Sequence, residues 1–285
     1  MVPETAVLLI SCPDQKGLVA CVSDFIYRNA GNIVHADQHI DPQQGIFFQR
    51  VEWELSGFNL GREEIGDAFR EIAGRFQMNW RLRFSSSRTR MAIFVSRYDH
   101  CLLELLNIIR AGEIPGEIAA VVSNHPDLEP MVAPFGIPFH VFPIRADNKC
   151  AQEEQELRLL SELRVDLVVL ARYMQILTPQ FLQCYPNLVI NIHHSFLPAF
   201  IGKKPYHQAY ERGVKLIGAT SHYVTDELDQ GPIIEQDVCR VTHRDSLADL
   251  MRKGRDLERN VLGRSVRWHL LHRVLPYGRK TVVFD

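Results

Sequence analysis

The first part of the chain alternates between strand-like and helical spacing of apolar residues. In residues 17–29, for example, Leu18, Val22 and Phe25 recur at helical intervals, which places them on one face of a helix. The polar segment Asp41–Gly45 separates two apolar stretches, as in a β-hairpin. The spacing predicts strand Thr5–Cys12, helix Gly17–Asn29, strands Asn32–Asp41 and Gly45–Leu55, helix Arg62–Phe76 and strand Asn79–Phe84. This βαββαβ order is that of a ferredoxin-like α+β domain.

The rest of the chain shows continuous apolar stretches separated by helical patterns. We expect strands at Met91–Ser96, Glu117–Ser123, Phe139–Phe142, Asp166–Leu170 and Leu188–Ile192, and helices at Asp99–Ala111 and Cys150–Leu163. Apolar strands that alternate with helices indicate a Rossmann-like α/β domain, with a mostly parallel sheet covered on both faces. Ligands of such sheets bind beyond the carboxyl ends of the strands, so the residues that follow the strands are the first candidates for a site.

A change in composition separates these two patterns. Residues 85–90 are small or charged and have no periodicity, which is typical of a linker. We therefore predict a first domain at residues 1–84, a linker at residues 85–90 and a second domain at residues 91–285. The second domain is expected to end with a long amphipathic helix at Asp245–Val274.

Composition and charge argue against several classes of protein. The formal net charge of −2 gives no electrostatic basis for binding nucleic acid or an anionic membrane. No apolar run approaches the roughly 18 residues of a membrane span, and the N-terminus lacks the features of a signal peptide, so we expect a cytoplasmic protein. The six cysteines are scattered without a C-x-x-C pair, which predicts free thiols and no metal site.

Candidate chemistry follows the strand Leu188–Ile192. Asn191 and His193 are two positions apart and project to the same face of an extended strand, whereas His194 points to the other face. Further along, a turn contains Asp229. An amide, an imidazole and a carboxylate can together act on a small carbonyl group.

Each of these three side chains has a role that its chemistry suits. Asn191 can donate an N–H to a developing oxyanion. His193 can donate to the same oxyanion as an imidazolium, or as a neutral imidazole it can take a proton from the nucleophile. Asp229 can orient the imidazole, raise its basicity and order an attacking water.

Two segments resemble the motifs of the formyltransferase family that uses N10-formyltetrahydrofolate. Asn191–His193 has the form N-x-H, and Leu228–Pro232 has the form L-D-x-G-P. In that family these motifs supply a catalytic Asn, His and Asp. The double-histidine segment His193–Pro198 is most similar to the hydrolytic branch, the formyltetrahydrofolate deformylases. The resemblance covers nearly the whole chain.

The resemblance implies that the chain hydrolyses 10-formyltetrahydrofolate to tetrahydrofolate and formate, with water as the acceptor and with no metal or further cofactor. It also implies two loops around the pterin ring, the first of which binds largely through backbone groups. The implied substrate-binding residues are Tyr173, Met174, Gln175, Ile176 and Leu177 in the first loop and Val224, Thr225 and Asp226 in the second. His222, on the strand before the second loop, fits either a structural role or a place beside the site.

Two alternatives remain. Relatives that formylate a phosphorylated ribonucleotide amine carry a Gly/Ser-rich loop after the first strand of this domain, where backbone N–H groups bind the phosphate. The corresponding segment Ser96–Cys101 has no glycine and places an anion at Asp99, which disfavours a glycinamide ribonucleotide formyltransferase, although Arg97 could bind phosphate alone. The other alternative is not an enzyme but an amino-acid-sensing, folate-binding regulator. The intact Asn–His–Asp set argues against it.

The N-terminal domain resembles the ACT domain, a small amino-acid-sensing module. The resemblance rests on Cys12–Val19 and Asn29–Ile33, whereas residue chemistry alone favours a plain turn and helix start at Asp14 and Gly17. It implies that an amino-acid effector, glycine or methionine, binds near Asp14, Gly17, Leu18, Asn32 and Ile33. It also implies a homo-oligomer formed through this domain, because such modules commonly pair by sheet edges or by helices.

Overall fold

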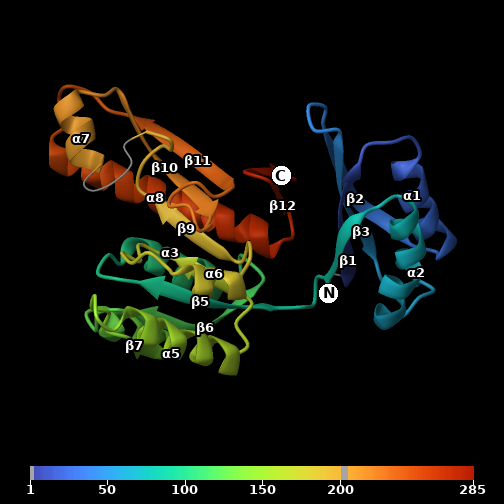
Figure 1. Ribbon diagram of the computed structural model, residues 1–285, viewed down its shortest axis with the longest axis horizontal. Coiled ribbons are helices and arrows are strands. Elements are labelled where there is room, and N and C mark those ends of the chain that lie inside the picture. Colours follow the sequence, from blue (N-terminus) through green and yellow to red (C-terminus); the bar gives the residue numbers. More distant parts are fainter. Residues whose placement is uncertain (1–2, 200–204) are drawn as a thin grey trace. The chain divides into compact units, whose positions relative to one another are not determined.

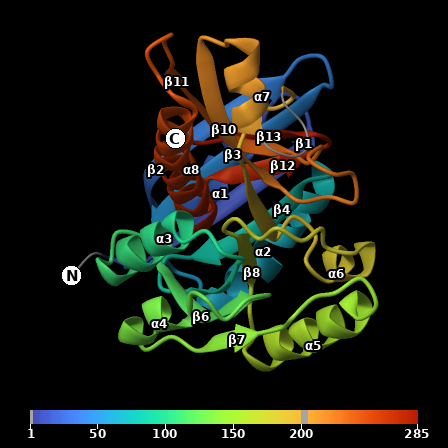
Figure 2. The ribbon, with the colours of Figure 1, turned by 90° about the vertical axis from the view of Figure 1, so that its left-hand side faces the viewer.

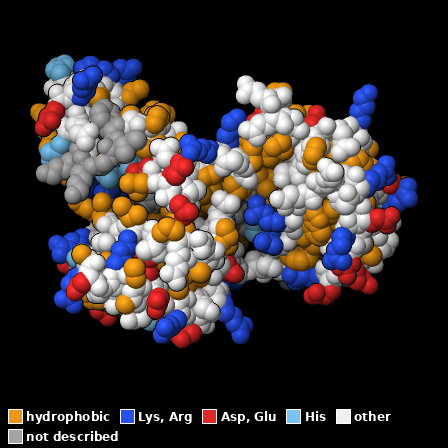
Figure 3. Space-filling view, in the orientation of Figure 1, with side chains coloured by type: hydrophobic (Ala, Val, Ile, Leu, Met, Phe, Trp, Pro, Cys, Tyr) orange, Lys and Arg blue, Asp and Glu red, His pale blue; other side chains and the backbone are white. Residues whose placement is uncertain are grey.

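The computed structural model describes residues 3–199 and 205–285, which divide into two compact units (Figure 1). The first unit comprises Met1–Arg88 together with two C-terminal segments, Leu271–Leu275 and Val282–Asp285. The second unit comprises Thr89–Leu270 and Pro276–Thr281. On the face drawn in Figure 3, acidic and basic side chains are interspersed, in agreement with the small net charge.

The first unit contains a four-stranded antiparallel sheet and two helices. Its elements are β1 (Thr5–Pro13), α1 (Leu18–Arg28), β2 (Asn32–Asp41), β3 (Ile46–Glu54), α2 (Arg62–Arg75) and β4 (Asn79–Phe84). The strand order is β2-β3-β1-β4. Buried side chains of the strands and of both helices, among them Leu8, Val22, Trp53 and Phe69, share one core. The predicted βαββαβ arrangement is therefore confirmed.

The second unit is built on a seven-stranded sheet. Its strands are β5 (Thr89–Val95), β6 (Gly116–Ser123), β7 (Phe139–Val141), β8 (Leu167–Leu170), β9 (Val189–His193), β10 (Leu216–Tyr223) and β11 (Ile233–Arg240). They lie in the order β11-β10-β9-β8-β5-β6-β7. Strands β5 to β9 are parallel, which confirms the predicted mostly parallel sheet. Strand β10 is antiparallel to both β9 and β11.

Helices cover both faces of this sheet. They are α3 (His100–Arg110), α4 (Glu129–Val132), α5 (Lys149–Glu162), α6 (Pro179–Cys184), α7 (Pro205–Arg212) and α8 (Leu247–Leu270), with a 3-10 turn at Ala133–Phe135. Helix α8 packs against α3 and against β9, β10 and β11, while α5 and α6 pack together on the other side (Figure 2). Since β5, β8 and β9 are neighbouring parallel strands, the loops that follow them meet at one edge of the sheet.

The C-terminal region differs from the sequence prediction. Helix α8 ends at Leu270, and the chain continues as two paired strands, β12 (Val274–Tyr277) and β13 (Lys280–Val283). Two segments of this region belong to the first unit, not to the second as residues 91–285 predicted. The physical reason lies at Arg50, which is almost fully buried and donates to the carbonyl oxygens of His272 (3.0 Å) and Leu271 (3.3 Å). The backbone of the tail thus supplies acceptors for a buried guanidinium.

Within the described parts of the chain, none of the helices combines the length and the apolar character that a membrane span requires.

Candidate active site

Asn191 and His193 lie at the end of β9, on the side where the parallel strands finish. The side chain of His193 is buried, and Asn191 is half-buried. Strand β10 runs antiparallel to β9 and places Thr220 opposite His193 and His222 opposite Asn191. The sheet therefore fixes two histidines and one asparagine on adjacent strands, close to the strand ends where ligands of such sheets bind.

Asp229 reaches the same place from the turn between β10 and β11. Its Oδ1 lies 3.3 Å from His193 Nδ1 and 3.9 Å from His222 Nε2. The turn needs Gly231, because a Cβ there would lie 1.7 Å from the carbonyl oxygen of Tyr223. Burial alone would raise the pKa of Asp229, but the hydrogen bond from His193 and the electrostatic interaction with the His193 and His222 rings outweigh it and lower this pKa. The carboxylate is therefore ionised at neutral pH.

His222 fixes the orientation of the Asn191 amide. Its Nδ1 lies 2.9 Å from the carbonyl oxygen of Tyr223, which can only accept, so Nδ1 carries the proton. Burial lowers the pKa of His222, which keeps the ring neutral and leaves Nε2 as an acceptor. Asn191 Nδ2 lies 3.2 Å from this Nε2 and donates to it. Sequence analysis could not reveal this contact, because it depends on the register of β10 against β9.

The same reasoning identifies the reactive nitrogen of His193. In the neutral ring, the Nδ1 that faces the Asp229 carboxylate carries the proton, and the lone pair is on Nε2. His193 Nε2 is buried and has no hydrogen-bond partner among the described residues. The structure thus brings the three predicted catalytic residues together. His193 Nε2 and the second N–H of the Asn191 amide are left to interact with a substrate.

The predicted first substrate loop follows β8 and divides into buried and exposed residues. Tyr173 and Leu177 belong to the core of the second unit, so their side chains do not face a ligand. Met174 and Ile176 are exposed, at 54% and 61%, and Gln175 is half-buried. The loop can therefore contact a substrate through these three side chains and its backbone.

Two buried glutamate side chains of α5 support this loop through hydrogen bonds. Glu153 accepts hydrogen bonds from the backbone N–H and hydroxyl of Thr178. Glu156 is fully buried and accepts from the Tyr173 hydroxyl at 3.2 Å. Burial raises the pKa of Glu156 to about 8, so it is largely protonated at neutral pH. Although this helix is rich in acidic residues, these two face the interior of the protein and not the solvent.

The predicted second loop, Val224 to Asp226, links β10 to the turn of Asp229. The backbone N–H of Val224 donates to the carbonyl oxygen of Val189, which ties the loop to β9. Val224 packs against the core, Thr225 is half-buried with its hydroxyl donating to the Glu227 carbonyl oxygen, and Asp226 is exposed. This loop therefore lies beside the candidate active site.

Ser96 connects the loops after β5 and β8. Its hydroxyl donates to Asn124 at 2.7 Å and accepts from the backbone N–H of Met174 at 3.0 Å. The segment Ser96–Cys101 then enters α3, where His100 and Cys101 are buried. Their side chains occupy the start of the helix, and the segment contains no glycine that would open it for a phosphate.

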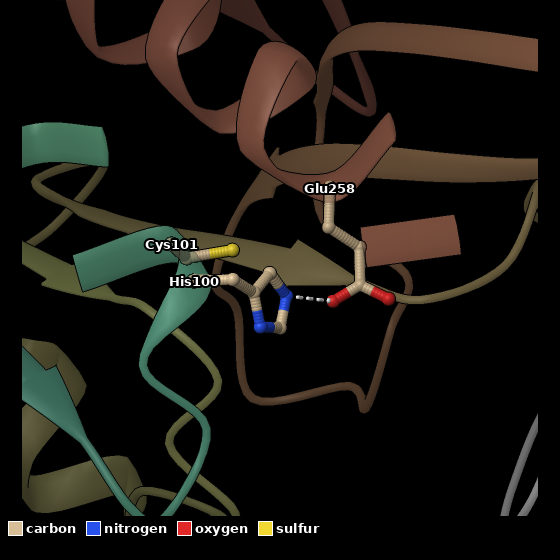
Figure 4. Close-up of side chains that lie close together, drawn as sticks. All are labelled: His100, Cys101 and Glu258. Atoms are coloured by element: carbon tan, nitrogen blue, oxygen red, sulfur yellow. Dashed lines mark hydrogen bonds and ion pairs between the residues drawn. The ribbon is translucent and has the colours of Figure 1, made fainter. Parts of the chain in front are cut away.

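His100 and Cys101 form, with Glu258 of α8, the one group among the described residues in which three potential metal-ligand atoms lie close together (Figure 4). The chemistry of the group does not suit a cation. Burial raises the pKa of Cys101 well above its usual range, so the sulfur remains a thiol. Glu258 is already within 2.8 Å of His100 Nε2 and 3.4 Å of Arg172 Nε. The positive guanidinium of Arg172 therefore already occupies the place beside the Glu258 carboxylate that a cation would need.

The predicted regulatory residues of the first unit lie in two separate places. Asp14 and Gly17 are exposed in the turn after β1, Gly17 has a φ of 93°, and the next residue, Leu18, belongs to the core. Asn32, which donates to Glu54 (3.0 Å), and Ile33 lie at the start of β2. The register places Asn32 level with Thr5, at the opposite end of β1, roughly 25–30 Å away at strand spacing. Within one chain, the predicted regulatory residues in the turn after β1 and those at the start of β2 therefore lie apart.

Comparisons with known proteins agree with this fold. A family model described as formyl transferase matches residues 89–266, so the chain belongs to the formyl transferase family. A formyltetrahydrofolate deformylase from Synechocystis is 58% identical over 98% of both chains, and one from Bacillus subtilis is 50% identical over 98% of this chain and 93% of its own. Within the family the chain is thus a member of the formyltetrahydrofolate deformylases and is an enzyme.

Solved structures show the same relationship. A formyltetrahydrofolate deformylase from Pseudomonas syringae superposes with a TM-score of 0.97 at 49% identity, over 99% of this chain and 95% of that one. A glycinamide ribonucleotide transformylase from Symbiobacterium toebii gives a TM-score of 0.65 at 33% identity, over 72% of this chain and 98% of that one. The transformylase is the more distant of the two relatives.

Proposed function

We propose that this enzyme hydrolyses 10-formyltetrahydrofolate to tetrahydrofolate and formate. The observation that carries the proposal is the contact of the Asp229 carboxylate with His193 Nδ1, which leaves His193 Nε2 as a buried base beside the Asn191 amide. Relatives named formyltetrahydrofolate deformylase at up to 58% identity support the same substrate.

The proposed chemistry uses each of these groups once. His193 Nε2 takes a proton from water, and the hydroxide attacks the formyl carbon. The second N–H of Asn191 donates to the oxyanion that forms, while His222 holds the amide in the required orientation. The imidazolium, stabilised by Asp229, then returns its proton to the leaving N10 as the C–N bond breaks. The products are tetrahydrofolate and formic acid, which ionises to formate.

We assign the folate to the two loops beside this site. Met174, Gln175, Ile176 and the loop backbone after β8 form one side, and Thr225 and Asp226 form the other. Tyr173, Leu177 and Val224 contribute by holding the loops against the core. No metal or further cofactor takes part, because side chains fill every proton-moving and polarising role.

Water, not a ribonucleotide amine, is the proposed acceptor. The segment Ser96–Cys101 enters α3 with His100 and Cys101 buried and offers no glycine-lined cradle to a phosphate. The lower similarity to the glycinamide ribonucleotide transformylases supports this choice.

We also propose that the first unit is an ACT-like regulatory domain that binds glycine or methionine and joins subunits. Its strand order is that of the βαββαβ arrangement. Strand β2 is a ten-residue edge strand with exposed Ile33, Val34 and Ile40, and such an edge favours pairing with a second copy. Pairing of two copies is also the way in which the two separated sets of regulatory residues could approach each other.

The experiment that tests the proposed function is incubation of purified protein with 10-formyltetrahydrofolate and no other acceptor, in the presence of a chelator. Formate release at a rate proportional to enzyme supports the hydrolase. Activity that appears only after glycinamide ribonucleotide is added would assign the protein to the transferases. Binding without turnover would identify a regulator.

A further inference from the structure

A cavity of about 410 Å³ lies next to the candidate active site, within the second unit. Its wall includes His194, whose ring centroid lies 5.2 Å from that of His193. It also includes Met174, from the proposed substrate loop. The cavity is therefore lined by one residue of the proposed substrate loop and by the histidine next to His193, although none of the steps above uses it.

The acidic group of this cavity is already fully bonded. Glu258 is 1% exposed, and its Oε1 accepts from the Tyr206 hydroxyl at 2.6 Å. Its Oε2 lies 2.8 Å from His100 Nε2 (Figure 4) and 3.4 Å from Arg172 Nε. Burial alone would raise the pKa of Glu258, but the hydrogen bond from His100 and the charge of Arg172 outweigh it and lower this pKa. The carboxylate stays ionised and has no free capacity to bind a ligand.

Arg172, in contrast, has unused donors. Its side chain is 9% exposed and lies over the Tyr98 ring, 5.0 Å from the centroid. Its Nη1 is buried without a hydrogen-bond partner among the described residues. The backbone of Arg172 also has a φ of 63°, a conformation that non-glycine residues seldom adopt. A buried guanidinium, held on an unfavourable backbone with donors unused, points to a ligand that supplies the acceptor.

The charges around the cavity define that ligand. Two arginines, Arg172 and Arg255, face one carboxylate, Glu258. Burial and the charge of Arg172 lower the pKa of His194 to about 3, so this ring is neutral and adds no charge. The balance is positive, and the planar fork of an arginine is suited to a carboxylate.

We propose that this cavity is a product subsite that receives formate, with Arg172 as its principal contact. The proposal rests on the proposed function, because hydrolysis generates formate beside His193. Formate is anionic and forms next to the Asp229 carboxylate, which repels it. Arg172 offers a partner of opposite charge in the cavity wall, and movement of formate to that position leaves the catalytic trio free for the next water.

The test measures formate as an inhibitor of hydrolysis in three proteins. Rates are followed by the loss of 10-formyltetrahydrofolate, so that neither added product disturbs the readout. The proteins are the wild type, Arg172→Gln and the control Arg252→Gln, which removes the same charge from an exposed position on α8. Loss of a charged hydrogen bond is worth roughly 1.5–3 kcal/mol, which corresponds to about 10- to 150-fold in affinity.

Arg172→Gln is expected to weaken formate inhibition by at least about 10-fold while inhibition by tetrahydrofolate changes by less than about twofold. Arg252→Gln is expected to match the wild type in both. Formate inhibition of Arg172→Gln within about twofold of the wild type would overturn the proposal.

A second measurement needs no variant and decides the matter if Arg172→Gln does not fold. Formate and tetrahydrofolate are added together to the wild type in a double-inhibition experiment. A separate formate subsite allows both to bind at once, which gives intersecting lines. Parallel lines would mean that the two exclude each other and would overturn the proposal. If the wild type releases no formate in assays without inhibitor, the proposed function itself is overturned.

Discussion

The direction of each hydrogen bond at the candidate active site follows from one backbone carbonyl group. The carbonyl oxygen of Tyr223 requires a proton on His222 Nδ1, which makes His222 Nε2 an acceptor for Asn191. One N–H of the Asn191 amide is thereby occupied and the other is aimed elsewhere. On the other side, Asp229 leaves the lone pair of His193 on Nε2. A preorganised donor and a base thus result from contacts outside the reacting groups.

At the scale of single residues, we predict that Asn191→Ala, His193→Ala and Asp229→Ala each lower kcat by on the order of 10² or more. The effect on folate binding is expected to be small, because these interactions strengthen in the transition state. Steady-state kinetics with the formylated folate measure both quantities. Glu154→Gln, at an exposed position on α5, is the control. A trio variant that keeps more than about half of the wild-type kcat would remove that residue from the mechanism.

At the scale of secondary-structure elements, the turn between β10 and β11 and the loop after β8 determine whether the site can form. The turn carries Asp229 and depends on a glycine that lies against the Tyr223 carbonyl group. The loop rests on Glu153 and Glu156 of α5. Neither support touches the reacting atoms, yet both decide where functional groups lie.

The turn yields a prediction for Gly231→Ala. A Cβ there would lie 1.7 Å from the Tyr223 carbonyl oxygen, so the backbone must move and take Asp229 with it. We expect a loss of kcat of at least on the order of 10², together with a lower Tm. Gly74→Ala is the control, because that exposed helical position has open space and tolerates alanine. Wild-type kinetics for Gly231→Ala would contradict the proposed position of Asp229.

The loop support yields a prediction for the pH dependence of stability. The pKa of Glu156 is raised from 4.5 to about 8 by burial. Its stabilising contribution is therefore complete below about pH 4.5 and is lost as the pH rises towards 8, since the folded state holds the proton longer than the unfolded state. Glu156→Gln removes this titration. Above pH 8 the free energy of unfolding of the variant should exceed that of the wild type by about 1–3 kcal/mol, seen as unfolding at a higher denaturant concentration. Equal pH profiles in chemical denaturation would show that Glu156 is ionised in the folded protein.

At the scale of the whole molecule, periodicity predicted the two architectures well because they depend on local spacing of apolar residues. The strand at Leu188–Ile192 was found in the same way, whereas Asn191, His193 and Asp229 were identified by their chemistry and by the resemblance of their motifs to those of the formyltransferase family. Sequence could not reveal His222 as a partner of Asn191, because the contact arises from strand register. It also missed the C-terminal segments around His272, since Arg50 is distant in sequence and finds its acceptors only in the folded chain.

The proposed regulatory unit yields a prediction for the whole chain. We expect glycine or methionine to change the rate of hydrolysis, and the folate substrate to change the affinity for that amino acid by the same factor. Activity assays and binding calorimetry on the full-length protein measure the two effects. A protein that begins near Arg88 should lose the response and part of its self-association. No response to either amino acid in full-length protein would leave the first unit without the proposed effector.

The protein that begins near Arg88 should be compared with a second shortened protein that also lacks the C-terminal tail. Residues of the C-terminal tail, among them Val274, Leu275 and Phe284, are buried in the full chain and belong to the first unit. Removal of the residues before Arg88, with the C-terminal tail kept, exposes these apolar side chains. A version that also lacks the segment after Leu270 is therefore expected to be the more soluble one, and sedimentation at equal concentration compares the two.

The central claim is that water attacks the formyl group at the trio of Asn191, His193 and Asp229. The most direct measurement is the hydrolysis of 10-formyltetrahydrofolate in water enriched in oxygen-18, with mass analysis of the formate. We predict that each formate carries one solvent oxygen and one oxygen of the original formyl group. The three alanine variants should release labelled formate more slowly than the wild type, by on the order of 10² or more. Formate without label, or no formate in the absence of an added amine, would contradict the account.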